Sequence, residues 1–85
     1  MTNKKKIGKL KEAARECLPS NMKIDSYDNI LWEEGGRKNR YHFKKNVMNH
    51  QVKSGDRWVR VRSYPVSKLT EDLLVLLVTS IGESL

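Results

Sequence analysis

Basic side chains recur at every second position in two stretches of the sequence, and this spacing suggests phosphate binding. In a β-strand every second side chain lies on the same face of the sheet, so each stretch would present its basic residues together. The guanidinium group of arginine can donate two hydrogen bonds to one phosphate, and an exposed aromatic ring can stack on a nucleobase for about 1–3 kcal/mol. The sequence therefore predicts a nucleic-acid-binding face that consists of Lys38, Arg40, His42, Lys44, Lys45, Trp58, Arg60 and Arg62.

The net charge of the chain is +7, and most of it comes from one segment. Residues 1–34 carry seven Lys or Arg against six Asp or Glu, residues 35–68 carry ten against one, and residues 69–85 carry none against three. Like charges crowded into one segment repel one another, and a polyanionic partner would relieve that repulsion. The distribution therefore favours a nucleic-acid partner over a surface that is merely well solvated.

Catalytic and metal-binding patterns are scarce in the sequence. Zinc sites usually need four ligands, whereas Cys17, His42 and His50 are the only Cys and His residues and show no paired spacing. The sequence contains no glycine-rich phosphate loop and no serine-nucleophile motif, so we expect no enzymatic activity, no cofactor and no metal. One enzymatic alternative stays open, because a small ribonuclease could use His42 as its general acid and base, with neighbouring basic residues stabilising the phosphate.

The length of 85 residues allows one domain that spans residues 1–85. Cys17 is the only cysteine, so no disulfide can form within the chain, and this fits a reducing compartment. No apolar run reaches the roughly 18–20 residues that span a bilayer. The basic start is followed by an amphipathic stretch, so we expect no signal peptide and a cytoplasmic location.

Helices are expected near both ends of the chain. Apolar residues recur at helical spacing from Asn3 to Leu18, and residues 20–27 fit a loop or an irregular strand. Within residues 68–85, Thr70-Glu71-Asp72 is typical of a helix start, although the apolar run 73–78 could also form a buried strand. A helix that is apolar all round needs additional cover in so small a domain. We therefore expect a homodimer through Leu73, Leu74, Leu76 and Leu77.

A β-hairpin is expected around Gly35-Gly36, which is a two-residue turn signal between residues 28–34 and 37–45. The turn sets the register and places Glu34 opposite Arg37 and Glu33 opposite Lys38, so that opposite charges meet. The same register pairs Trp32 with Asn39, Leu31 with Arg40 and Ile30 with Tyr41. One face would then carry Ile30, Trp32, Tyr41 and Phe43, and the other would carry Lys38, Arg40, His42 and Lys44.

A third strand is expected over Arg57–Tyr64, with Pro65 ending it. Alternation directs Val59 and Val61 toward the core and directs Trp58, Arg60, Arg62 and Tyr64 to the outer face, so that Arg40 and Arg62 share one surface. Residues 46–53 show no clear preference. We therefore predict a small α+β domain in the order α-β-β-β-α, with an antiparallel three-stranded sheet and both helices packed on one face.

This order of elements with a basic sheet is similar to double-stranded-RNA-binding domains and to HicA-type RNA-cleaving toxins. The triplet His42-Phe43-Lys44 looks like the catalytic-histidine strand of those toxins, which would make His42 the catalytic residue. The chain departs from both families. Glu71-Asp72 stands where double-stranded-RNA binders have a basic helix start, and the glycine that usually precedes the toxin histidine is absent.

The whole chain, with its opening Met-Thr-Asn-Lys-Lys-Lys, also resembles the TifA-like family of T-even-like phages, which inhibit the ToxN toxin of type III toxin–antitoxin defence systems. The resemblance implies a basic, dimeric protein that binds RNA with little sequence preference and neutralises a toxin ribonuclease in an RNA-containing complex. The matching positions would be the basic residues from Arg37 to Lys45 and from Arg57 to Arg62. The toxin partner is implied by the resemblance alone.

The sequence as a whole therefore predicts an RNA-binding protein of low sequence specificity, and the resemblance adds a role as a phage counter-defence inhibitor. Two alternatives stay open. One is the small ribonuclease with His42 as its general acid and base. The other is a protein-only inhibitor whose basic face docks on an acidic protein surface.

Overall fold

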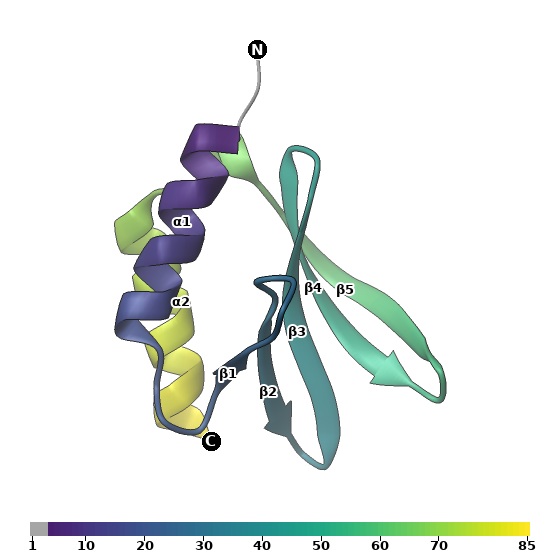
Figure 1. The fold of residues 1–85 in the computed structure, drawn as a ribbon. Helices are drawn as coiled ribbons and strands as arrows, with labels where there is room; N and C mark the ends of the chain where they lie inside the picture. Colours follow the sequence, from purple (N-terminus) through teal and green to yellow (C-terminus); the bar gives the residue numbers. More distant parts are fainter. Residues whose placement is uncertain (1–3) are drawn as a thin grey trace.

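The computed structural model describes residues 4–85, in which two α-helices lie on one side of a β-sheet (Figure 1). The elements follow in the order α1 (Lys4–Cys17), β1 (Lys23–Ile24), β2 (Ile30–Glu34), β3 (Arg37–Lys44), β4 (Val47–Ser54), β5 (Arg57–Pro65), a 3-10 turn η1 (Val66–Lys68) and α2 (Glu71–Ser84). Both expected helices are present, and the apolar run 73–78 is helical. The predicted helix start at Asn3 lies outside the described residues.

The strands form one five-stranded antiparallel sheet in the order β1-β2-β3-β4-β5, so each strand pairs only with its neighbours along the chain. The prediction of a three-stranded sheet is therefore wrong. It missed β4 because polar residues occupy both faces of this strand, which hides the usual alternation. Asn49 is buried and accepts a hydrogen bond from Ser63, and His50 bonds with the buried Asn39. It also left β1 undecided, and this strand is only two residues long.

The hairpin between β2 and β3 has the predicted register, from Glu34 opposite Arg37 to Ile30 opposite Tyr41. Gly35 and Gly36 make the turn with φ angles of +59° and +77°. Successive positive φ angles define the tight turn whose twist suits a hairpin, and glycine adopts them without a steric cost. The turn thus fixes which side chains of β2 and β3 lie on each face.

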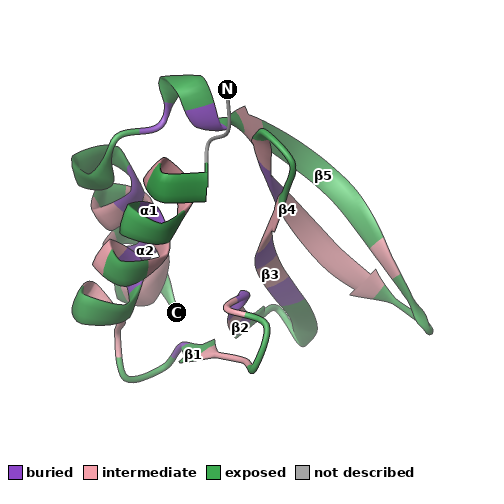
Figure 2. Ribbon diagram, turned by 45° about the horizontal axis from the view of Figure 1, so that its top comes forward, coloured by how far each residue is buried: buried purple, intermediate pink, exposed green. Residues whose placement is uncertain are grey.

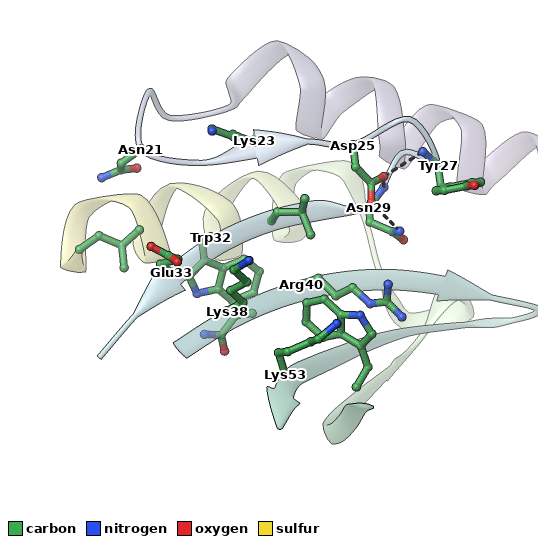
Figure 3. Close-up of a pocket in the computed structure, with 14 residues that line it drawn as sticks. Asn21, Lys23, Asp25, Tyr27, Asn29, Trp32, Glu33, Lys38, Arg40 and Lys53 are labelled. Atoms are coloured by element: carbon green, nitrogen blue, oxygen red, sulfur yellow. Dashed lines mark hydrogen bonds between the residues drawn. The ribbon is translucent and has the colours of Figure 1, made fainter. Parts of the chain in front are cut away.

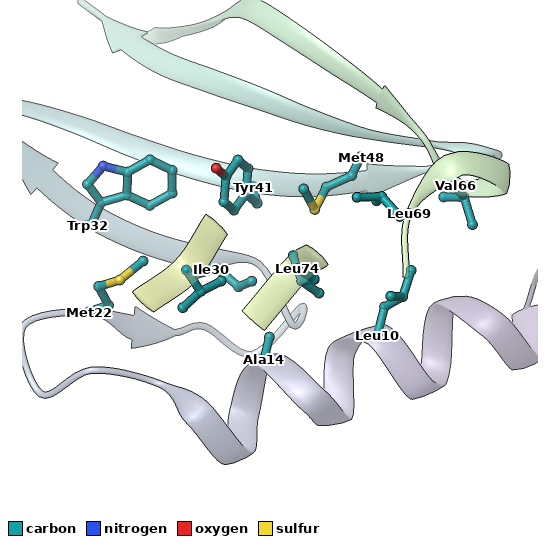
Figure 4. Packing of buried hydrophobic residues seen from close by; sticks show 11 residues of the cluster. Leu10, Ala14, Met22, Ile30, Trp32, Tyr41, Met48, Val66, Leu69 and Leu74 are labelled. Atoms are coloured by element: carbon teal, nitrogen blue, oxygen red, sulfur yellow. The ribbon is translucent and has the colours of Figure 1, made fainter. Parts of the chain in front are cut away.

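Both helices lie on the same side of the sheet and pack against each other (Figure 1). Leu10 and Ala14 of α1 and Leu74 and Val78 of α2 are buried in the core between the two layers. From the sheet, the core receives Ile30, Trp32, Tyr41 and Met48 (Figure 4). The core completes with Met22, Val66 and Leu69 from the connections. The helix-covered side is called the inner face below, and the opposite side is called the outer face.

Helix α2 begins at an N-cap, where the Thr70 side chain accepts a hydrogen bond from the Leu73 backbone N–H at 3.0 Å. Leu74 is completely buried within this one chain, and Leu77 is half-buried. Leu73 and Leu76 are 39% and 61% exposed, respectively. Of the four leucines predicted to form a dimer interface, Leu74 is therefore already used by the core, and Leu73 and Leu76 offer the most accessible surface.

Burial is uneven along the sheet (Figure 2). The β4–β5 hairpin carries no fully buried residue from Gln51 to Tyr64, whereas β2 and β3 hold several beneath the helices.

Neither helix of residues 4–85 is long and apolar enough to cross a membrane.

Candidate nucleic-acid interface

The outer face is built by residues that pair directly across the strands. The register places Lys23, Leu31, Arg40, Gln51 and Arg60 in one row that crosses all five strands. Directly opposite residues of an antiparallel sheet lie on the same face. Lys53 and Trp58 form the next pair between β4 and β5. Lys38, His42 and Lys44 lie on this face as well because they alternate with Arg40 along β3.

A β-bulge divides the face that the sequence predicted as one surface. His50 pairs with Arg62, but Gln51 pairs with Arg60, so Val61 is an extra residue in β5. The extra residue reverses the side-chain directions along β5 at this point. Trp58 and Arg60 therefore lie on the outer face with Arg40, whereas Arg62 lies on the inner face.

The expected shared surface of Arg40 and Arg62 is thus wrong, and so is the outward placement of Tyr64. Tyr64 pairs with the buried Met48, and its ring meets that of Tyr41 with 6.0 Å between centroids. Val59 and Val61, which were expected in the core, are 49% and 56% exposed. Strict period-2 alternation misplaced Val61, Arg62 and Tyr64 because a bulge leaves no clear mark in the sequence, whereas Val59 lies on the inner face opposite Val52 but is not covered there.

Arg40 is the central basic side chain of the outer face. Its guanidinium carbon lies 4.2 Å from the centre of the Trp58 ring, and Lys53 Nζ lies 5.2 Å from the same ring. Arg40 Nε also donates a hydrogen bond of 2.6 Å to Gln51 Oε1. Burial lowers the pKa of Arg40 while Asp25 acts in the opposite direction, and an arginine keeps its charge at neutral pH. The outer face therefore holds a stacked cation at its centre.

A groove of about 740 Å³ opens on the outer face beside this cluster (Figure 3). Its basic lining residues are Lys23, Lys38, Arg40 and Lys53. Its aromatic lining residues include Tyr27 and Trp58, and its acidic ones are Asp25 and Glu33. Figure 3 shows Asp25 and Tyr27 on one side of the groove and Arg40 and Lys53 on the other. The volume falls within the range of about 300–1,000 Å³ that is usual for ligand sites.

Tyr27 is 80% exposed, yet its backbone is held firmly. Asp25 Oδ1 accepts hydrogen bonds of 2.9 Å from the backbone N–H groups of Tyr27 and Asn29, and Asp25 Oδ2 accepts one of 3.0 Å from Asn29 Nδ2. Burial acts to raise the pKa of Asp25, but these hydrogen bonds outweigh it and hold the pKa below its ordinary value. The turn therefore presents a solvent-exposed aromatic ring from a fixed position.

His42 is joined to the same turn through the buried Asn29. Its Nδ1 lies 2.8 Å from Asn29 Oδ1. Because the amide group of Asn29 donates to Asp25, its oxygen is the acceptor, and His42 must carry a proton on Nδ1. Burial lowers the pKa of His42, and the nearby charges of Arg40 and Lys44 lower it further. At neutral pH the ring is therefore uncharged, with its proton on Nδ1 and a lone pair on Nε2.

Among the basic and exposed aromatic residues of the groove, three were absent from the sequence prediction. Lys53 belongs to β4, the strand without a recognisable pattern, and Lys23 belongs to the two-residue strand β1. Tyr27 lies in the turn that follows β1. The Asp at position 25, two residues before it, is the one available signal, because Asp side chains commonly accept hydrogen bonds from the backbone two residues later. Lys44 and Lys45 lie at the β3–β4 turn, away from the residues that line the groove.

Comparison with protein-family models, curated proteins and solved structures found no match to this chain. Within residues 4–85, no group of three or more His, Cys, Asp or Glu side chains is arranged to hold a metal ion. What the site can do therefore follows from its own chemistry. It combines spread positive charge, a stacked arginine, accessible aromatic rings and a groove.

Proposed function

We propose that this protein binds RNA with little sequence specificity through the outer face of its sheet. The observation that carries the proposal is the row from Lys23 through Arg40 to Arg60, which crosses the whole sheet and has the Arg40–Trp58 stack beside it. Positive groups spread along a surface neutralise successive phosphates, and aromatic rings stack on bases of any sequence. Single-stranded or structured RNA is favoured over duplex DNA because neither helix lies on this face, so neither could enter a major groove from it.

Measuring the affinity at several salt concentrations tests this mechanism. Engagement of about four to six phosphates of a single strand would give a slope of about −3 to −4 for log affinity against log salt. A steep slope that is similar for unrelated RNA sequences is the expected result. A flat response would remove the electrostatic mechanism, and strong preference for one sequence would indicate base-specific contacts.

A small ribonuclease is the second candidate, and the Asp25–Asn29–His42 chain of hydrogen bonds favours it. A histidine that keeps its proton on Nδ1 has Nε2 available to accept the proton of a ribose 2′-hydroxyl. The 2′-oxygen would then attack the adjacent phosphorus and expel the 5′-oxygen, which takes a proton from water. Incubation of end-labelled RNA with the native protein and with His42→Ala tests this. The ribonuclease predicts 2′,3′-cyclic phosphate ends with the native protein only, and binding that His42→Ala retains.

A biological role follows from the resemblance to the TifA-like family alone. On that basis we propose a cytoplasmic phage protein that neutralises a toxin ribonuclease in an RNA-containing complex, with a homodimer formed through α2. A protein-only inhibitor that docks its basic face on an acidic surface is the competing interpretation. Nuclease treatment of the purified toxin complex separates the two, because only a protein-only complex should survive the loss of RNA.

A further inference from the structure

We propose that the groove on the outer face accepts one unpaired nucleobase, so that the protein selects RNA with unpaired nucleotides over continuous duplex. This inference rests on the proposed RNA binding and adds the part of the RNA that is recognised. The groove is bounded by Arg40 and Trp58 on the sheet side and by Tyr27 on the side of the β1–β2 turn. Its occupant is identified below from the charges and the rings that line it.

The charges of the groove are distributed unequally between its two sides. Both carboxylates lie on the β1–β2 side, since Asp25 follows β1 and Glu33 belongs to β2, with Lys23 of β1 beside them, whereas Lys38, Arg40 and Lys53 come from β3 and β4. A phosphate deep in the groove would approach two carboxylates, which costs free energy in a partly desolvated site. An uncharged base has no such cost. The division therefore favours a base inside the groove and phosphates along the basic residues at its rim.

The rings of the groove suit the flat face of a base. The Arg40 guanidinium carbon lies 4.2 Å from the centre of the Trp58 ring, and both side chains line the groove, so a base that enters it meets a planar cation and an aromatic ring. Tyr27 supplies a second ring that is 80% exposed and has a hydrogen-bonded backbone. Leu31 adds an apolar contact on the groove lining.

A continuous duplex cannot fill this site. Its bases are stacked on one another and paired, so their faces become available only where a nucleotide is unpaired or displaced. Both a duplex and an RNA with unpaired nucleotides can make phosphate contacts with the basic residues at the rim. The structure therefore predicts that single-stranded and bulged RNA make both kinds of contact, whereas a perfect duplex makes only the phosphate contacts.

The test uses the full-length protein and three RNA probes at one salt concentration. The probes are a single strand, a perfectly paired duplex and the same duplex with one bulged 2-aminopurine. Each is titrated with the native protein, Tyr27→Ala, Trp58→Phe, Trp58→Ala and Lys44→Ala. Because Trp58 is half-buried, thermal unfolding of each variant checks that it folds. Trp58→Phe keeps an aromatic ring at this position and serves as the second variant if Trp58→Ala does not fold.

The native protein is expected to bind the single strand and the bulged duplex about tenfold tighter than the perfect duplex, and the bulged 2-aminopurine should lose fluorescence on binding. Tyr27→Ala and Trp58→Ala should weaken those two probes by about tenfold and leave the perfect duplex unchanged, with Trp58→Phe close to the native protein. Lys44→Ala should weaken all three probes equally, because it removes only a phosphate contact outside the groove.

Two results would overturn the groove as a base site. One is equal affinity of the native protein for all three probes, and the other is an equal loss on all three in Tyr27→Ala and a folded Trp58 variant. Failure of the proposed function has a separate signature. In that case none of the three probes would bind with a salt-dependent affinity, whichever variant is used.

Discussion

The guanidinium carbon of Arg40 in β3 lies 4.2 Å from the centre of the Trp58 ring in β5, so the two side chains meet across β4. An arginine over an indole at a partly exposed site contributes about 0.5–1 kcal/mol. A double-mutant cycle with Arg40→Ala and Trp58→Ala should therefore give a coupling free energy of this size in urea unfolding. The matched cycle of Lys44→Ala with Trp58→Ala should be additive, because Lys44 lies at the far end of β3. Additivity in the first cycle would mean that the contact does not stabilise the fold.

The bulge at Val61 predicts that two neighbouring arginines contribute unequally to RNA binding. Arg60→Ala removes a cation from the outer face and should lower the magnitude of the salt slope by about 0.7 on a single strand. Arg62→Ala removes the same charge from the inner face, where the guanidinium lies 5.1 Å from the Tyr64 ring, and should change the slope less. Binding isotherms at four salt concentrations make the comparison. Equal losses would argue for recognition by net charge instead of by the outer face.

Acidification should destabilise the protein through its two histidines. Burial lowers the pKa of His42 and of His50 below the ordinary value of 6.5, with the charges of Arg40 and Lys44 adding to the effect at His42. The unfolded chain therefore binds more protons than the native state below about pH 6.5, and the free energy of unfolding must fall as the pH falls through this range. Urea unfolding at pH 7.5, 6.5 and 5.5 measures this fall in the free energy of unfolding. A double variant His42→Asn and His50→Gln should show a smaller fall, and constant stability of the native protein would contradict the prediction.

Gly82 is predicted to be required for packing, although it lies inside α2. A Cβ atom at this position would collide with Pro19 Cγ and would lie 2.7 Å from Pro19 Cβ. The proline ring cannot swing aside as a flexible chain would, so Gly82→Ala should destabilise the protein by about 1–3 kcal/mol despite the better helix propensity of alanine. Gly8 in α1 is the matched control, since nothing lies within 4 Å of a Cβ there. Gly8→Ala should stabilise by up to about 1 kcal/mol in thermal unfolding. Opposite signs for the two variants are the expected outcome, and equal signs would refute the close contact.

The exposed leucines of α2 provide a test of self-association. Leu76 is 61% exposed, and Leu73 is 39% exposed three residues earlier on the helix. If α2 forms a homodimer, Leu76→Glu should convert it to a monomer in sedimentation equilibrium, because the interface would bury an unpaired charge. Ser80→Glu, at another exposed position of α2, is the control for added charge. A native protein that sediments as a monomer at high concentration would rule out this interface.

Local signals in the sequence were enough to predict both helices and the β2–β3 hairpin. Gly35 and Gly36 favour a two-residue hairpin turn with positive φ angles, and that turn determines every pairing from Glu34–Arg37 to Ile30–Tyr41. The strands β1 and β4 gave no such signal. One is too short to show a period, and the other places Asn49 and His50 on opposite faces with hydrogen-bond partners elsewhere in the sheet.

In the candidate site, too, the sequence predicted the position of some residues and not of others. Lys38, Arg40, His42, Lys44, Trp58 and Arg60 lie on the outer face as predicted. Arg62 does not, because the extra residue Val61 reverses the alternation that had been correct up to Arg60. Tyr27 joins the site only through the fold of its turn. The sequence thus indicated the chemistry of the surface, and the pairing of β4 with β5 decided which residues share it.

The order of strands in space repeats their order along the chain. Each hairpin can therefore form as soon as its second strand has left the ribosome, without waiting for distant segments, and short-range pairing of this kind speeds folding. The helical layer behaves in the opposite way, since α1 and α2 come from the two ends of the chain and pack on each other. Closure of the core must wait until α2 has been synthesised. Until then the apolar inner face of the sheet lacks α2, and at this stage the nascent protein is most prone to aggregation.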